Sequence, residues 1–377
     1  MGGVNAVTLR QHAARAASPD PGFRPATNRM SLVRSCLVLA ARFAAVLGAA
    51  APVSAEVFIV PPMGVDLVGV EENTVARFED TMPDIARRYG LGYEEILNAN
   101  PGTDPWLPGD GREILLPTRH ILPAQRDGVV INLSEHRLYY FPRPKDGQRP
   151  QVVSHPISIG QMDWETPLGV TRIVSKTKKP TWYPPQSIRK QHEQEGTPLP
   201  RAVPPGPDNP LGDYAMRLGI PGGAYLIHGT NRPVGVGLPV THGCIRMYPE
   251  DIESLFARVK VNTPVLIINQ PIKTGWVGDV LYLEVHPRVD TARPPAANAA
   301  NDTRNPAALT EMKAPGASSP VAGMDLTTLT RLLVNATRDK PVRINWALAE
   351  RTLQEARGMP IAISLPQVSV GQDAAGQ

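Results

Sequence analysis

The chain has little cysteine, and this shortage limits what its chemistry can be. Of 377 residues only two are cysteine, Cys36 and Cys244. Cys36 falls within a predicted export signal, so the mature protein would hold one thiol and could form no internal disulfide. A lone thiol with His228 and His242 nearby in the sequence indicates an activated nucleophile. The thiolate is the reactive form, and an imidazole within hydrogen-bond reach can generate it near neutral pH.

The sequence also lacks a basic region outside its first 55 residues. Residues 1–55 hold six Arg and one Asp, which leaves 33 of the 39 basic and 34 of the 35 acidic residues for the remainder. The pI of about 9.1 is therefore largely a property of the leader. A remainder with a net charge of −1 has no basic patch of the kind that nucleic acid needs, so we expect no nucleic-acid partner.

An apolar run long enough for a confident membrane span is missing as well. Residues 31–55 carry Arg34 and Arg42, then a short alanine-rich run, and end on the small residues Val53-Ser54-Ala55. This order is typical of a cleaved secretory signal at the end of the leader 1–55, and Met30 is the expected start of the translated chain. An uncleaved anchor is the alternative.

Residues 57–120 predict a small α+β unit. Thr81 can cap a helix that Gly90 ends, and a second helix over 93–98 is stopped by Asn100-Pro101-Gly102 before a strand near 114–117. This order resembles a LysM module, a fold that binds glycan strands rich in N-acetylglucosamine. The matching residues are Asp80-Thr81, Ile85-Ala86, Tyr89-Gly90, Leu97, Asn100-Pro101, Pro108-Gly109 and Ile114 to Pro117. The alternative is a generic α+β spacer.

Residues 125–287 are rich in strand patterns. The predicted strands cover residues 128–133, 136–141, 151–159, 169–175, 224–228, 263–269 and 280–286. Ser134-Glu135 reads as a two-residue hairpin connection. A helix is predicted over 249–260, because Pro249 and two acidic residues open it and apolar residues recur at helical spacing.

Three other segments complete the predicted organisation. The proline-rich stretch 177–212 is long for a loop and predicts a semi-rigid cover, with a decorative insertion as the alternative. Residues 290–322 are rich in Ala, Pro and Asn and predict a linker. The segment 325–366 predicts two short helices, over 325–334 and 346–357, with Gly358 as a C-cap. We expect these helices to pack back on the catalytic domain.

The region around the thiol carries the elements of an acyl-transfer site. His228 ends a predicted strand, and Cys244 follows Gly243 in a loop before the helix at 249. Such a site needs a nucleophile, a base and N–H donors at the future oxyanion. Spacing alone does not decide whether His228 or His242 is the base. Two alternatives are a buried structural cysteine and a zinc site of Cys244, His228 and His242, although no fourth ligand is evident.

At these residues the chain resembles the L,D-transpeptidase family, which has a YkuD-type catalytic domain. The resemblance rests on His228-Gly229-Thr230 and on Thr241-His242-Gly243-Cys244-Ile245-Arg246. It extends over most of 57–287 and is closest to the ErfK/YbiS-like periplasmic branch. The implied fold is mainly β: a β-sandwich catalytic domain with a small α+β LysM-like module before it and short helices after it.

The resemblance also implies a role for each residue. Cys244 attacks the carbonyl before the terminal D-Ala of a stem tetrapeptide, and His228 is the base, oriented by a backbone carbonyl that we expect to be that of Gly229. His242 and the Gly243 and Cys244 amides would stabilise the oxyanion. The predicted substrate-binding residues are Arg246, Thr230, Asn231, Tyr214 and Thr241. No metal or cofactor is expected, because no complete ligand set is visible.

The implied function is that of a periplasmic enzyme acting on peptidoglycan stem peptides and glycan strands. The acyl-enzyme would be taken by a diaminopimelate amine, giving a 3-3 cross-link, or by the lysine of an outer-membrane lipoprotein. Two alternatives remain. One is an L,D-carboxypeptidase that uses water as acceptor. The other is a non-catalytic cell-wall-binding protein, against which the intact Cys244 and His228 argue.

Overall fold

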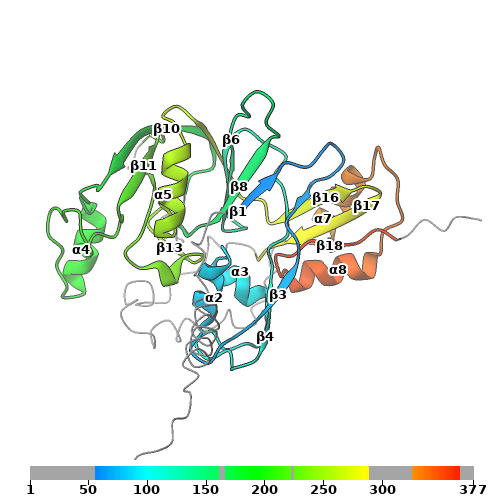
Figure 1. Cartoon of the computed structure of the whole chain (residues 1–377), viewed down its shortest axis with the longest axis horizontal. Helices are drawn as coiled ribbons and strands as arrows, with labels where there is room; N and C mark the ends of the chain where they lie inside the picture. The colour runs from blue at the N-terminus through cyan, green and yellow to red at the C-terminus, as the bar shows by residue number, and fades with distance from the viewer. Residues whose placement is uncertain (1–55, 161–165, 222–224, 288–324, 366–377) are drawn as a thin grey trace, which may run out of the picture. The chain divides into compact units, whose positions relative to one another are not determined.

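The structure is a computed structural model that describes residues 56–160, 166–221, 225–287 and 325–365 (Figure 1). The predicted leader 1–55 and linker 290–322 lie outside the described residues. Within the described part of the chain, no helix has the length and apolar character needed to cross a membrane.

A nine-stranded sheet forms the main body and confirms the prediction of a mainly β protein. All neighbouring strands pair antiparallel except β6–β15 and β12–β14, which are parallel. The strands, in spatial order, are β1 (Glu56–Ile59), β8 (Gln151–Pro156), β7 (Arg137–Phe141), β6 (Gly128–Asn132), β15 (Pro264–Ile268), β10 (Gly169–Lys178), β11 (Tyr214–Leu218), β12 (Leu226–His228) and β14 (Ile245–Arg246).

The sheet curls around one apolar core. Alternate residues of a strand face opposite sides, and Val129 and Ile131 of β6 share a core cluster with Ile227 of β12 and Ile245 of β14. The curl brings Ser158, just after β8, against Arg246 of β14, where both backbone amides donate across the gap at 2.8 and 3.0 Å. The short strands β9 (Ile159–Gly160) and β13 (Pro239–Thr241) pair in parallel beside this contact.

Helix α5 (Pro249–Arg258) covers one end of the core, alongside β11 in Figure 1. Pro249 stands in its first turn with Glu250 and Asp251, as predicted, and Ile252 and Leu255 enter the core. Acidic residues suit this position because the amide dipoles of a helix leave its N-terminus partly positive.

The N-terminal unit has the predicted order of strand, helix, helix and strand. It consists of β3 (Glu72–Val75), α2 (Met82–Arg88), α3 (Tyr93–Ala99) and β4 (Glu113–Leu116) around a small core of its own. Thr81 caps α2 in a capping box with Asp84. The predicted boundary at residue 57 is wrong for the first strand, since β1 pairs with β8 in the main sheet.

This unit is fixed to the main body by specific contacts. Arg87 at the end of α2 makes a two-pronged ion pair with Glu250 of α5, each N–O distance being 2.8 Å. The Tyr248 hydroxyl donates to the Leu91 carbonyl at 3.1 Å. A short antiparallel pair, β2 (Leu67–Val68) with β5 (His120–Ile121), closes the unit.

The proline-rich stretch 177–212 was predicted to be a semi-rigid cover, and it contains a helix that the sequence did not predict, α4 (Gln186–Gln194). Pro185 is its N-cap and Ile188 is its one buried residue, so the apolar periodicity was too weak to reveal it. The stretch is closed at its base by backbone hydrogen bonds of 2.8 and 2.9 Å between Trp182 and Val203. It is therefore an ordered element over its described residues.

The C-terminal segment builds a second small core. Helices α7 (Leu326–Ala336) and α8 (Trp346–Glu355) pack on a three-stranded sheet of β16 (Ile272–Val277), β17 (Val280–Val285) and β18 (Ile361–Ala362) (Figure 1). As expected, the helices pack on residues of the predicted catalytic domain 125–287. The part that they contact is its hairpin 272–285, which forms a sheet separate from the nine-stranded one.

Two local predictions are corrected. The C-cap of α8 is Ala356, which takes the left-handed conformation at φ 43°, and Gly358 lies two residues further on, beside the His286 ring. The connection between β6 and β7 is the four residues 133–136, not Ser134-Glu135 alone. Its last residue, His136, has φ 51°.

Candidate active site

The two short strands β12 and β14 place the predicted site residues side by side. Their parallel register pairs Ile227 with Ile245 and His228 with Arg246. Both isoleucines are fully buried in the main core. Because side chains alternate along a strand, His228 and Arg246 lie on the opposite face. Cys244 directly precedes β14, and continuing the alternation places it on that face too.

The imidazole of His228 is held in one tautomer. Its Nδ1 lies 2.6 Å from the carbonyl oxygen of Gly229, which is the contact that the sequence analysis predicted. A carbonyl can only accept, so Nδ1 carries the proton and Nε2 carries the lone pair. Burial, and after it the charge of Arg246, lowers the pKa of His228 to about 3. The ring is therefore neutral near pH 7 and can accept a proton at Nε2.

The thiol of Cys244 is protonated in the same environment. Burial raises its pKa above the ordinary value, while a backbone group of Leu226 and the charge of Arg246 act in the opposite direction. The two pKa shifts favour the protonated thiol and the neutral imidazole near pH 7.

A tight turn over residues 241–244 presents the thiol. Gly243 has φ 86°, a conformation that favours glycine. The Thr241 hydroxyl donates to the Cys244 carbonyl at 2.5 Å, and the Thr166 hydroxyl donates to the Gly243 carbonyl at 3.1 Å. Thr241, predicted to bind substrate, is 3% exposed, and its hydroxyl holds the turn.

Basic side chains lie near His242 and Arg246 and affect their pKa values. Burial lowers the pKa of His242, and the charges of Arg246 and His192 of α4 lower it further. Burial and the charge of Arg232 lower the pKa of Arg246 to about 10, against an opposing effect of Cys244. The sequence reasoning missed Arg232 and His192. Arg232 lies just outside the matched motif, and nothing in the local pattern of the insertion marks His192.

The segment after His228 is tied to the insertion. Thr230 is buried, and its hydroxyl accepts from the Arg232 amide at 2.9 Å. The Asn231 side chain donates to the Pro207 carbonyl at 2.9 Å. Gly212 packs so closely that an added Cβ would stand 2.9 Å from the Thr230 nitrogen. The Asn231 hydrogen bond and the packing of Gly212 against Thr230 thus join the strand end to residues 207–212.

The structure does not bring the Tyr214 hydroxyl to Cys244. That hydroxyl donates to Glu253 of α5 at 2.8 Å, and the ring packs against Phe256 with centroids 5.0 Å apart. Tyr214 lies next to Ala215, which pairs with His228, so alternation points the two side chains to opposite faces. The prediction that Tyr214 contributes a hydroxyl to the site is therefore wrong for this arrangement.

The loop between His228 and Cys244 also touches the N-terminal unit. The 3₁₀ turn η1 (Pro233–Gly235) leads into Val236, whose carbonyl accepts from the Tyr93 amide at 2.9 Å. Gly237 follows with φ 95°, and a Cβ there would stand 2.2 Å from the Tyr93 nitrogen. His136 adds a contact of 2.8 Å from Nδ1 to the Gly237 carbonyl. This close packing fixes the loop that joins the two site residues.

The described residues do not assemble the zinc site considered from the sequence. Within the described ranges, three metal-ligating atoms come within 4.8 Å of one another only at Glu135, Glu284 and His286, away from Cys244. A cation already stands there, because the Lys273 ammonium lies 2.8 Å from Glu135 and 2.6 Å from Glu284. That cluster is an ion-pair network.

Comparisons with known proteins agree on one family. The model of the YkuD family, described as the L,D-transpeptidase catalytic domain, matches residues 126–267. The probable L,D-transpeptidase ErfK/SrfK of Escherichia coli K12 is 38% identical over 309 residues, which are 81% of this chain and 89% of the relative. The probable L,D-transpeptidase YcfS of the same strain is 43% identical over 237 residues, 62% of this chain and 73% of the relative.

The chain belongs to the L,D-transpeptidase family. The range that the L,D-transpeptidase model matches contains both His228 and Cys244 and ends within β15. The hairpin β16–β17 and helices α7 and α8 lie beyond it. Among solved structures, the catalytic domain of the L,D-transpeptidase from E. faecium is 23% identical and covers 39% of this chain and 100% of its own, with a TM-score of 0.28.

Proposed function

We propose that this protein is a peptidoglycan L,D-transpeptidase, a transferase that works through a Cys244 acyl-enzyme. The observation that carries the proposal is the shared face of β12 and β14. There a neutral imidazole, with its lone pair on Nε2, shares the face of the strand pair with the thiol in a family-specific motif. Cys244 is the proposed nucleophile and His228 the proposed base.

The first half-reaction breaks an amide and forms a thioester. Sγ of Cys244 attacks the carbonyl before the terminal D-Ala of a stem tetrapeptide while its proton passes to His228 Nε2. Because the resting pair is neutral, this transfer accompanies the attack. The Gly243 and Cys244 amides, with His242, would stabilise the oxyanion. The proton then moves from His228 to the leaving nitrogen, and D-alanine departs.

The second half-reaction returns the enzyme to its starting state. An amine attacks the thioester, His228 takes a proton from the attacking nitrogen, and the thiol leaves and is reprotonated. The acceptor is a diaminopimelate amine, which gives a 3-3 cross-link, or the lysine of an outer-membrane lipoprotein. The positive charges of Arg232 and Arg246 favour a carboxylate of the donor peptide near the thiol.

The N-terminal unit is proposed to bind the glycan strand as a LysM module does. Support comes from its strand–helix–helix–strand order and from two apolar side chains on its loops, Phe78 and Leu107, which are 85% and 77% exposed. Its contacts with Glu250 and Val236 would hold a bound strand at a fixed position relative to Cys244. Export to the periplasm, where peptidoglycan lies, fits the predicted leader.

Mass analysis of products formed from defined muropeptides tests this function. A transpeptidase given tetrapeptide muropeptides yields cross-linked dimers with loss of D-alanine. Adding a lysine-terminated acceptor peptide shows whether a lipoprotein-type amine is used. Products that are tripeptides alone would replace the proposal by an L,D-carboxypeptidase, and unchanged substrate would reject both.

A further inference from the structure

The loop between His228 and Cys244 is held at its middle by donors from outside the loop. Successive carbonyls there accept hydrogen bonds from different parts of the chain. The pairs are the Ser158 hydroxyl with Gly235 at 2.8 Å, the Tyr93 amide with Val236 at 2.9 Å, and His136 Nδ1 with Gly237 at 2.8 Å. Because these donors come from separate segments, the loop can shift only if several parts of the molecule move with it.

Ser158 also holds the strand that follows Cys244. It lies just after β8 and is 0% exposed. Its backbone amide and carbonyl pair with Arg246 at 2.8 and 3.0 Å, while β12 pairs with the other edge of β14. Ser158 therefore contacts the loop before the thiol through its side chain and the strand after the thiol through its backbone.

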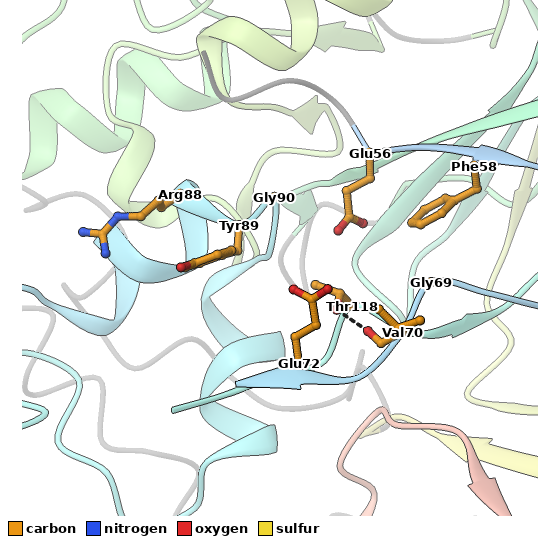
Figure 2. Close-up of a pocket in the computed structure, with 9 residues that line it drawn as sticks. All are labelled: Glu56, Phe58, Gly69, Val70, Glu72, Arg88, Tyr89, Gly90 and Thr118. Atoms are coloured by element: carbon orange, nitrogen blue, oxygen red, sulfur yellow. Dashed lines mark hydrogen bonds between the residues drawn. The ribbon is translucent and has the colours of Figure 1, made fainter. Parts of the chain in front are cut away.

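The contact at Tyr93 is the tightly packed side of the N-terminal unit. A Cβ on Gly237 would stand 2.2 Å from the Tyr93 nitrogen, and one on Gly92 would stand 3.0 Å from the Gly237 Cα. The unit is packed less closely where it meets β1, since a cavity of about 380 Å³ lies there (Figure 2). The residues that line this cavity are Glu56, Phe58, Gly69, Val70, Glu72, Arg88, Tyr89, Gly90 and Thr118. The N-terminal unit thus fits the loop more closely than it fits β1.

The position of this loop matters for the chemistry because the loop joins the base to the nucleophile. Proton transfer from Cys244 Sγ to His228 Nε2 requires the two atoms to come within hydrogen-bond reach. A misplacement of about 1 Å can lower a rate about 100-fold. The buried Ser158 hydroxyl donates to the loop and is closed off from the donor peptide, so it can affect the reaction only through the loop.

We infer that Ser158, His136 and the Tyr93 amide form a brace that holds residues 233–238, and that Ser158 is a positioning residue for acyl transfer. The catalytic consequence rests on the function proposed above, whereas the brace itself does not. Since Tyr93 belongs to the N-terminal unit, this unit is also a structural part of the acyl-transfer site.

Hydrogen exchange of the full chain, followed by mass spectrometry, tests the brace without reference to activity. Ser158→Ala leaves the Gly235 carbonyl without its donor, so amides of residues 234–244 should exchange about tenfold faster, as expected for one lost hydrogen bond. Ser154→Ala is the matched control. Ser154 lies in β8, is 2% exposed, and its hydroxyl accepts from Arg137 at 2.8 Å. Its loss should leave exchange over 234–244 unchanged.

Single-turnover acylation by a stem tetrapeptide then tests the positioning role. Ser158→Ala should lower the rate at saturating donor about tenfold to 100-fold. The donor concentration that gives half the maximal rate should stay the same, because the hydroxyl does not contact the donor. Ser158→Thr keeps the hydroxyl and should recover most of the rate. Ser154→Ala should acylate at the wild-type rate per folded molecule.

His136 supplies a second pair of variants in case Ser158→Ala does not fold. His136→Asn keeps an N–H close to the position of Nδ1, and asparagine accepts the φ of 51° found there. This variant should exchange about as the wild type does. His136→Ala removes the donor and should speed exchange over 234–244 in the same way as Ser158→Ala.

Unchanged exchange over 234–244 in both Ser158→Ala and His136→Ala would overturn the brace. An equal loss of acylation in Ser154→Ala and Ser158→Ala would overturn the positioning role, since it would show an effect of buried serine on stability alone. A wild-type chain that forms no acyl-enzyme would reject the proposed function instead, and the exchange rates would still decide whether the brace exists.

Discussion

Two buried clusters in this molecule both combine histidine with charged groups, but ion pairs set the direction of the pKa shifts in one and burial sets it in the other. In the network of Lys273, Glu135, Glu284 and His286, the lysine lies 2.8 and 2.6 Å from the two carboxylates, and His286 Nε2 lies 2.6 Å from Glu284. Although burial alone would lower it, these carboxylates raise the pKa of Lys273. The lysine stands between the two carboxylates, and the network joins β16 and β17 to residues of the β6–β7 connection and β5.

The group around Cys244 is arranged in the opposite way. Burial and neighbouring positive charge lower the pKa values of His228 and Arg246, and burial raises that of Cys244. Burial acts against the charged form of each of these groups. The comparison teaches that convergence of ligand-type residues does not mark the functional site here. The functional site is instead marked by buried titratable groups whose pKa values are shifted toward their neutral forms.

Replacing Cys244 with Ala should give the largest effect, complete loss of acyl transfer with the fold retained. The thiol supplies the bond-forming atom, and no other described cysteine can replace it. Product analysis by mass spectrometry, with circular dichroism as a check on folding, measures both. Cross-linked product from the purified variant would contradict the assignment of the acyl-transfer activity to the group around Cys244.

Replacing His228 with Ala should lower the rate by about 10²–10⁴, the usual cost of losing a general base. His242→Ala is the matched control, since it also removes a partly buried imidazole from the same cationic surroundings, and it should cost much less. Rates of acyl-enzyme formation under single-turnover conditions provide the comparison. A larger loss in the His242 variant would reverse the assignment of the base.

Replacing Lys273 with Met should act on stability and leave the chemistry unchanged. The substitution leaves two buried carboxylates without their cation. Removing one partner of a buried ion pair typically costs about 3–5 kcal/mol. Lys340→Met is the control, because the Lys340–Asp279 pair is exposed and should contribute little. Urea unfolding gives the free energies, and the activity per folded molecule should match the wild type. Equal stability of the two variants would contradict the account of the network.

Much of the fold and of the candidate site could be predicted from the sequence. The features that could not be predicted depend on contacts between distant segments. The strand before His228, the glycine before Cys244 and the opening of α5 depend on neighbours in the chain, so local patterns predicted them. The pairing of β1 with β8 and the packing of α7 and α8 on β16–β17 depend on distant segments. The Lys273 network joins residues more than 100 positions apart in the sequence, and the cavity at Glu56 joins residues more than 60 positions apart. No local pattern reveals either of them.

The smallest predicted effect is on the pH dependence of Cys244 alkylation. Only the thiolate reacts, and a raised thiol pKa means that its fraction at pH 7 is below that of free cysteine. The rate should therefore rise with pH beyond the ordinary thiol range, with no step near 6.5, because His228 stays neutral above about pH 3. Arg246→Gln removes a charge that lowers the pKa of the thiol, so the rate at pH 8 should fall a few-fold. A plateau by pH 6 would indicate a preformed ion pair.

The central claim is that Cys244 accepts the acyl group, and intact-protein mass spectrometry tests it most directly. The chain is mixed with a stem tetrapeptide whose amines are blocked, so that no acceptor can release the thioester, and the reaction is quenched in acid. The account predicts one adduct per chain with the mass of the tetrapeptide less D-alanine, absent in Cys244→Ala. An unmodified wild-type chain, or the same adduct in the variant, would contradict it.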